Sequence, residues 1–226
     1  MRIKEINLHH IQMRLKNPFT NSFSTVKDRR FIIIEAALED GLTGWGECVA
    51  FEHPWYTEET IYTCAHLLKD VLIPSVMVKP IRHPDDLTSL FAPVRRNPMA
   101  KSALEGAVWD LYAKKNGLSL AKALGGEKKR IEAGISIGLK ETDAELFRTI
   151  DEALKHGYKR IKLKIKPGQD ISLISKVRTR YPSLPIMADA NSAYTLADLE
   201  RLHALDQYDL MMIEQPLAYN DLYEHA

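Results

Sequence analysis

The chain has 226 residues, of which 45% are hydrophobic and 27% are charged, a composition typical of a globular protein with a substantial core. Its 31 basic and 30 acidic residues nearly cancel, which argues against nucleic acid or an anionic membrane as a partner. No stretch approaches the ~18 apolar residues of a membrane span, and the N-terminus lacks the apolar core of a signal peptide. Cys48 and Cys64 lack metal-binding spacing, so we expect buried free thiols in a cytoplasmic protein.

The first part of the chain predicts three strands, and then helices. Strands are expected at residues 3–15, 31–38 and 42–49, with Asp40-Gly41 as a hairpin turn. Residues 16–30 are polar and contain Asn17-Pro18, so we expect a mobile loop there. Thr57 is a candidate cap for a helix with apolar residues at helical spacing, which are Ile61, Ala65, Leu68 and Leu72. Pro98 fits the first turn of another helix, whose apolar stripe is Ala103, Leu104, Ala107, Val108 and Leu111.

After Gly126 the pattern changes to alternating strands and helices. The expected strands are 131–137, 160–165, 184–188 and 209–213, and the expected helices are 143–156, 170–180 and 195–205. Such units form a parallel sheet with right-handed crossovers. We therefore predict an α/β protein of two domains: an α+β capping domain at 1–125, and the first half of a (β/α)₈ barrel at 126–226.

Three short polar segments follow the apolar runs of the predicted barrel: Lys162-Leu-Lys164, Asp189-Ala-Asn191 and Glu214-Gln-Pro216. The C-terminal ends of barrel strands face one common mouth, where active sites are built. Lys162 and Lys164 are two residues apart and would point to the same side of a strand. The alternative is an edge strand with two solvated lysines.

The two carboxylates also have an ordinary alternative. Asp189 could cap the next helix, although Thr195 is the better cap. Glu214 directly follows an apolar run, where an unpartnered carboxylate is costly. Carboxylates at this mouth suggest a hard cation such as Mg²⁺, and a lysine beside the cation suggests proton abstraction next to a carboxylate.

This combination resembles the enolase superfamily and, within it, the group that contains o-succinylbenzoate synthase and N-acylamino acid racemase. The stretch Met99 to Gly126, with Glu105-Gly-Ala-Val-Trp-Asp110, is similar to the capping helices of that family. The resemblance implies that Lys164 is the general base or acid. Lys162 would be the neighbouring cation that disfavours its charged form, and Asp189 and Glu214 would be ligands of Mg²⁺ or Mn²⁺. It places a third carboxylate ligand and a second lysine beyond Ala226.

The same resemblance implies a set of substrate contacts: Ser136, Asn191, Phe19, Phe23 and Ser24. Each has a plainer interpretation. Ser136 could be a strand-end serine without a role, and Asn191 could be a turn residue. The three residues of the 16–30 segment could be ordinary loop packing.

The expected activity is metal-assisted abstraction of a proton α to a carboxylate, with an enediolate intermediate. The first choice is an o-succinylbenzoate synthase, which performs a dehydration in menaquinone biosynthesis. The alternatives are N-acylamino acid racemisation, another epimerase or cycloisomerase reaction of the superfamily, or a catalytically inactive fragment. The expected partner is a small-molecule carboxylate. We also expect a homo-oligomer, because an apolar open edge at 210–213 invites pairing with another chain.

Overall fold

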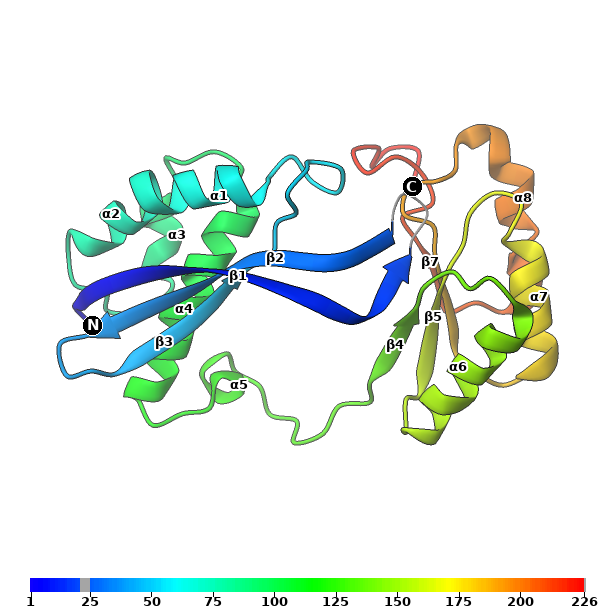
Figure 1. Cartoon of the computed structure of the whole chain (residues 1–226), viewed down its shortest axis with the longest axis horizontal. Helices are drawn as coiled ribbons and strands as arrows, with labels where there is room; N and C mark the ends of the chain where they lie inside the picture. The colour runs from blue at the N-terminus through cyan, green and yellow to red at the C-terminus, as the bar shows by residue number, and fades with distance from the viewer. Residues whose placement is uncertain (21–24, 226) are drawn as a thin grey trace. The chain divides into compact units, whose positions relative to one another are not determined.

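The computed structural model describes residues 1–20 and 25–225 of the chain. The chain divides into two compact units (Figure 1). The first comprises Met1–Lys16 and Asp28–Lys129, and the second comprises Asn17–Lys27 and Arg130–Ala226. The second unit therefore includes a short segment from the early part of the chain.

The first unit contains a three-stranded sheet in the order β1-β2-β3, as predicted. Its strands are β1 (Ile3–Thr20), β2 (Thr25–Leu38) and β3 (Thr43–Cys48). Strands β2 and β3 are antiparallel, with Ile32 opposite Cys48. Gly41 adopts a φ of 84° in the turn between them, a left-handed conformation that favours glycine, so the predicted hairpin is confirmed.

The prediction of a loop over residues 16–30 is wrong for the residues that the structure describes. Strand β1 continues to Thr20 and β2 begins at Thr25, where the two threonine hydroxyls lie 2.9 Å apart. Strand pairing needs only backbone groups, so polar residues do not prevent it. Pro18 is tolerated because β1 is an edge strand of this sheet, where a missing N–H costs no ladder bond.

Helices complete the first unit, and their apolar stripes are buried as expected. The elements are α1 (Ile61–Leu67), the π-helical turn η1 (Leu68–Leu72), α2 (Ile73–Met77), α3 (Asp86–Phe91), α4 (Pro98–Lys115) and α5 (Leu120–Ala123). The prediction of Thr57 as the first cap is wrong. Thr60 caps α1 through a capping box with Thr63. The neighbouring Glu59 is buried and accepts hydrogen bonds from the N–H groups of Met99 and Ala100, at the start of α4.

Helix α4 packs directly against β3. A Cβ atom on Gly46 would lie 2.1 Å from the carbonyl oxygen of Ala103, and one on Gly44 would lie 2.3 Å from that of Ala107. Glycine is required at both positions because the helix backbone occupies the space of a side chain. Cys48 and Cys64 are buried in this core as free thiols, as predicted.

The second unit contains a four-stranded parallel sheet in the order β4-β5-β6-β7. Its strands are β4 (Gly134–Ile137), β5 (Arg160–Lys164), β6 (Ile186–Asp189) and β7 (Met212–Glu214). The connections hold α6 (Asp143–Lys155), α7 (Ile171–Arg180), η2 (Leu196–Asp198), α8 (Leu199–His203) and η3 (Asp206–Tyr208). This sequential order of parallel strands joined by helices is consistent with the predicted first half of a TIM barrel.

The two faces of this sheet differ in chemistry. Helices α6, α7 and α8 lie on one side of it (Figure 1). Ile161, Leu163 and Ile165 are fully buried in the core that these helices help to form. Because strand residues alternate between faces, Lys162 and Lys164 belong to the opposite face. The predicted phase of this strand is therefore confirmed, and its polar face carries the candidate site.

Candidate active site

Strand register brings three charged side chains into one row at the carboxyl ends of the strands. Lys164 on β5 is paired with Asp189 on β6, and Asp189 is paired with Glu214 on β7. Parallel strands end at the same edge of a sheet, so residues at their last positions become neighbours although they are far apart in sequence. This register confirms the sequence-based expectation that Lys164, Asp189 and Glu214 lie close together.

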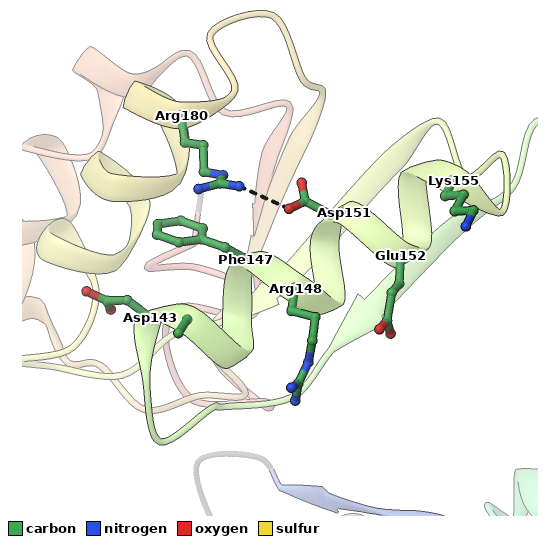
Figure 2. A pocket seen from close by; sticks show the side chains of 8 residues that line it. Asp143, Phe147, Arg148, Asp151, Glu152, Lys155 and Arg180 are labelled. Carbon is green, nitrogen blue, oxygen red and sulfur yellow. Dashed lines mark hydrogen bonds and ion pairs between the residues drawn. The ribbon is translucent and has the colours of Figure 1, made fainter.

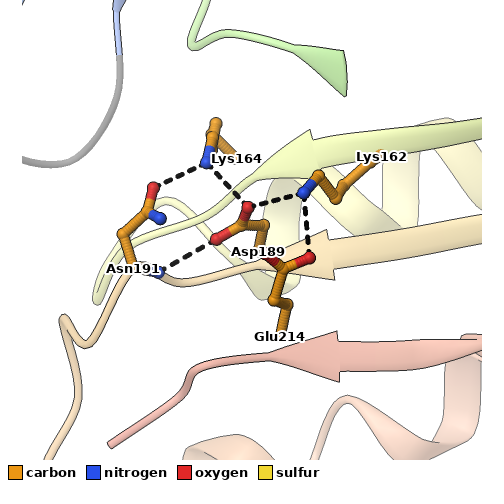
Figure 3. A network of polar contacts seen from close by, with 5 residues as sticks. All are labelled: Lys162, Lys164, Asp189, Asn191 and Glu214. Atoms are coloured by element: carbon orange, nitrogen blue, oxygen red, sulfur yellow. Dashed lines mark hydrogen bonds and ion pairs between the residues drawn. The ribbon is translucent and has the colours of Figure 1, made fainter. Parts of the chain in front are cut away.

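Lys164 is held by two side chains from the adjacent strand end (Figure 3). Its Nζ atom donates to Asp189 Oδ2 at 2.7 Å and to Asn191 Oδ1 at 2.7 Å. Lys164 is 8% exposed and Asp189 is 1% exposed. A buried ammonium group is costly unless it is paired and hydrogen-bonded, and both conditions are satisfied here.

Lys162 lies two register positions before Lys164 on the same face of β5, and its ammonium group bridges the two carboxylates (Figure 3). Its Nζ atom lies 2.8 Å from Glu214 Oε2 and 3.0 Å from Asp189 Oδ2. Burial acts to lower the pKa of Lys162, but the hydrogen bonds to Glu214 and Asp189 outweigh it, so the pKa is raised. Burial acts to raise the pKa of Asp189, but the two ammonium groups outweigh it, so that pKa is lowered. The cluster is therefore a charged network of two cations and two anions.

Asn191 is both a turn residue and a member of this network. Its φ is 46°, a left-handed conformation that asparagine tolerates better than most residues. Its backbone N–H donates to Asp189 Oδ1 at 3.1 Å, while its side-chain oxygen accepts from Lys164. One residue thus contacts both Asp189 and Lys164.

Phe19 is the described residue of the early segment that reaches this site. Its ring centroid lies 5.9 Å from Nζ of Lys164. The neighbouring carbonyl of Thr20 accepts a hydrogen bond of 3.2 Å from the N–H of Leu139, just after β4. A Cβ atom on Gly138 would lie 2.8 Å from that carbonyl oxygen. Phe19 was predicted from the sequence as a contact, whereas Gly138 was not, because its only signal was a glycine after a predicted strand. Phe23 and Ser24 lie outside the described residues.

Ser136 lies on the polar face, but two register positions before the row of Lys164, Asp189 and Glu214. It is paired with Lys162 across β4 and β5. Ser136 is exposed and contributes to a small cavity of about 200 Å³. The other lining residues are Gly134, Ile135, Arg160, Lys162 and Met187. The structure thus brings Ser136 next to Lys162 rather than to Lys164.

The donor set fits a hard divalent cation. Asp189 and Glu214 supply carboxylate oxygens on neighbouring strands, and a single ammonium group already lies between them. Oxygen ligands are those that Mg²⁺ prefers, and Mg²⁺ commonly uses only one or two carboxylates together with waters. Across residues 1–20 and 25–225, no group of three or more His, Cys, Asp or Glu side chains is arranged to hold a metal. The chemistry of the pair, rather than a complete ligand set, supports a cation here.

A wider hollow of about 620 Å³ lies elsewhere, along α6 (Figure 2). Its lining side chains are exposed or half-buried, and two of them, Arg180 and Asp151, form an ion pair of 3.0 Å. Paired, solvated charges of this kind are typical of an ordinary helix surface.

In the part of the chain that the structure describes, no helix is both long and apolar enough to span a membrane.

Comparison with known families decides the relationship. Residues 3–125 match the N-terminal domain of the mandelate racemase and muconate lactonizing enzyme family, and residues 145–226 match the enolase C-terminal domain-like family. The chain belongs to the enolase superfamily. This assignment agrees with the capping sheet and the partial barrel, and it confirms the family resemblance seen in the sequence.

Individual members of the enolase superfamily are closely similar to this chain. An o-succinylbenzoate synthase of Geobacillus kaustophilus is 55% identical over 99% of this chain and 60% of its own length. An N-succinylamino acid racemase of Thermus thermophilus is 42% identical over 100% of this chain and 61% of its own length. A crystal structure of an enolase superfamily member from Listeria innocua has a TM-score of 0.95 and 42% identity, with 100% of this chain and 61% of that chain covered. The chain therefore spans about 60% of the length of the curated relatives that it matches.

Proposed function

We propose that the complete protein to which this chain belongs catalyses metal-assisted abstraction of a proton α to a carboxylate, through an enediolate intermediate. The observation that carries the proposal is the row of Lys164, Asp189 and Glu214 at one strand edge. It combines a lysine, which can act as a base, with carboxylates suited to a divalent cation. The specific reaction proposed is that of o-succinylbenzoate synthase, supported by the 55% identity to such an enzyme over nearly the whole chain.

In this mechanism each residue of the network has a separate task. In the structure Lys164 is the ammonium partner of Asp189. After it has lost one proton to solvent, its neutral amine takes the α-proton of the substrate, and it can return that proton to the departing hydroxyl oxygen so that water leaves. Lys162 keeps its charge and stabilises the negative charge that develops on the substrate carboxylate. Asn191 orients the Nζ atom of Lys164, which it contacts at 2.7 Å. Phe19 limits the access of water to that atom.

Asp189 and Glu214 are the proposed ligands of Mg²⁺ or Mn²⁺. When bound, the cation would supply a positive charge that stabilises the enediolate. Ser136 and Asn191, together with the residues at positions 19, 23 and 24, are the proposed substrate contacts. The proposal also includes a small-molecule carboxylate as substrate, a cytoplasmic location and assembly as a homo-oligomer.

The test is the metal dependence of turnover in the complete protein. We expect formation of o-succinylbenzoate that is lost after chelation with EDTA and restored by Mg²⁺. Asp189→Asn and Glu214→Gln should raise the Mg²⁺ concentration needed for half-maximal activity by at least about tenfold, because neutral amides attract Mg²⁺ less strongly than carboxylates do. The matched control is Asp151→Asn, which alters an exposed carboxylate in an ion pair on α6. Full turnover after exhaustive chelation would remove the metal from the mechanism.

Racemisation of N-acylamino acids is the second candidate. It is favoured by the 42% identity to an N-succinylamino acid racemase over the whole chain. A racemase exchanges the α-proton of both enantiomers with solvent. Incubation of each enantiomer of an N-succinylamino acid in D₂O, followed by mass spectrometry, would distinguish the two activities, because a pure synthase leaves both substrates unlabelled.

A further inference from the structure

A second buried carboxylate lies in the barrel unit, outside the network around Lys164. Asp170 is 1% exposed and immediately precedes α7. It accepts hydrogen bonds from the N–H of Ile171 at 2.8 Å, the hydroxyl of Tyr194 at 2.8 Å and Nη1 of Arg201 at 3.1 Å. A carboxylate buried to this degree requires such partners, and in turn it fixes their positions.

Tyr194 is the partner that connects this carboxylate to the candidate site. It is 2% exposed, so its hydroxyl has little access to water and depends on Asp170. Burial and the neighbouring carboxylate both raise the pKa of Tyr194, which therefore remains a hydrogen-bond donor. The hydrogen bond holds the end of the short segment, residues 190–194, that follows β6.

The segment from 190 to 194 contains strained backbone. Asn191 and Ser192 have φ values of 46° and 61°, a left-handed conformation that is unfavourable for residues other than glycine, although asparagine tolerates it better than serine does. Two consecutive residues of this kind persist only where surrounding contacts hold them. On the β7 side, the N–H of Ser192 donates to the carbonyl of Gln215 at 2.7 Å, and that of Tyr194 donates to the carbonyl of Pro216 at 3.0 Å. The Asp170 contact is the side-chain anchor at the end of this segment.

We propose that Tyr194, anchored by Asp170, is a positioning residue that holds the 190–194 segment so that Asn191 fixes Lys164. The chain of contacts runs from Asp170 to Tyr194, through the strained backbone, to Asn191 Oδ1 and then to Nζ of Lys164. The conformational part of this proposal concerns the protein alone. Its kinetic part rests on the proposed function, in which Lys164 transfers the proton.

A purely stabilising hydrogen bond would have a different signature. Loss of such a bond lowers the melting temperature but leaves the 190–194 segment and Lys164 unchanged in the folded protein. A positioning role instead couples Tyr194 to Asn191, and energetic coupling between two residues appears as non-additive effects in a double-mutant cycle.

The matched pair for the test is Tyr194→Phe and Tyr181→Phe, in the complete protein. Tyr181 also donates its hydroxyl to a carboxylate, Asp151 Oδ1 at 2.6 Å, but on the exposed side of α6 and α7. Hydrogen–deuterium exchange should be at least about tenfold faster at residues 190–195 in Tyr194→Phe and unchanged there in Tyr181→Phe. Acetylation of Lys164 by acetic anhydride, measured by mass spectrometry, should also be faster only in Tyr194→Phe.

The kinetic arm uses the same variant in two backgrounds. Tyr194→Phe should lower kcat by about tenfold with little change in KM, and it should have little further effect once Asn191→Ala is present. If the complete wild-type protein shows no synthase or racemase turnover, the proposed function fails, while exchange and acetylation still decide the positioning claim. Equal rates of exchange and acetylation in Tyr194→Phe and Tyr181→Phe would overturn the positioning claim. The same loss of kcat from Tyr194→Phe in the wild-type and the Asn191→Ala backgrounds would also overturn it.

Discussion

The ammonium group of Lys162, on β5, lies 2.8 Å from the carboxylate of Glu214, on β7, so this ion pair spans the intervening strand β6. Asp189 on that strand lies 3.0 Å from the same ammonium group. The ammonium group of Lys162 therefore bridges two carboxylates, at the place where we propose a divalent metal.

Removal of this cation should destabilise the metal-free protein. Lys162→Met leaves Asp189 and Glu214 to repel each other, with Lys164 as the remaining cation of the network, so we expect a loss of about 2 kcal/mol in the free energy of unfolding. The control Lys176→Met removes an exposed ion pair with Asp143 and should cost at most about 1 kcal/mol. Thermal melts with and without Mg²⁺ measure both effects, and Mg²⁺ should reduce the deficit of Lys162→Met alone. Equal stability of the two variants in metal-free buffer would contradict this account.

Asp170 should contribute to stability in a pH-dependent way. Burial acts to raise its pKa, but hydrogen bonds from Ile171 N–H and the Tyr194 hydroxyl outweigh it, so the pKa lies below the ordinary 3.8. A lowered folded-state pKa stabilises the protein above pH 3.8, and the stabilisation is lost as the pH falls below 3.8 through the folded-state pKa. The difference in melting temperature between wild type and Asp170→Asn should therefore be larger at about pH 6 than at about pH 3. A difference that grows toward low pH would show that the sign is wrong.

Arg178 should be a major contributor to the stability of the barrel unit. Its guanidinium donates to the backbone carbonyls of Leu184, Tyr208, Asp209 and Pro182 at 2.8 to 3.0 Å. Lysine cannot reproduce this fork, so Arg178→Lys should lower the free energy of unfolding by about 2–3 kcal/mol. Arg180→Lys, at an exposed ion pair with Asp151, should change it by less than about 0.5 kcal/mol. Chemical denaturation of both variants measures the difference, and similar midpoints would refute the role given to Arg178.

The 226-residue chain expressed by itself should self-associate through β7. This strand is an edge of the described sheet, and Met211 and Met212 beside it are 57% and 43% exposed. Exposed apolar edges pair with other chains, and a charged residue on the edge discourages that pairing. Size-exclusion chromatography with light scattering should show assemblies that Met212→Lys reduces and that Met77→Lys, on α2, does not. A monomer of 25.7 kDa for the unmodified chain would contradict this expectation.

Hydrophobic pattern predicted the barrel strands, because each is a short apolar run whose alternate residues face a buried helix layer. The same alternation places Lys162 and Lys164 on one face of β5. Local sequence patterns gave wrong predictions where contacts between residues far apart in the chain determine the structure. Strand β1 extends through polar residues to Thr20 because β2 supplies its backbone partners. Thr57 is not the cap of α1, and Glu59, two residues after it, accepts hydrogen bonds at the start of α4, about 40 residues away in the chain.

The details of the candidate site were only partly accessible from sequence. The row of Lys164, Asp189 and Glu214 follows from strand ends that coincide in a parallel sheet. The bridge made by Lys162 and the anchoring of Tyr194 by Asp170 depend on side-chain directions in three dimensions, which residue spacing does not encode. Asp170 carried only the local signal of a residue at a helix start.

The most direct test of the central claim is turnover by Lys164→Ala in the complete protein. Removal of a general base should lower kcat by about 10³-fold or more, while circular dichroism shows an intact fold. Asp189 keeps a partner in that variant, since Lys162 lies 3.0 Å from it. The control Lys166→Ala, two residues along the chain, should retain near wild-type turnover. Purified, folded Lys164→Ala that retains most of the wild-type activity would contradict the assignment of Lys164 as the base.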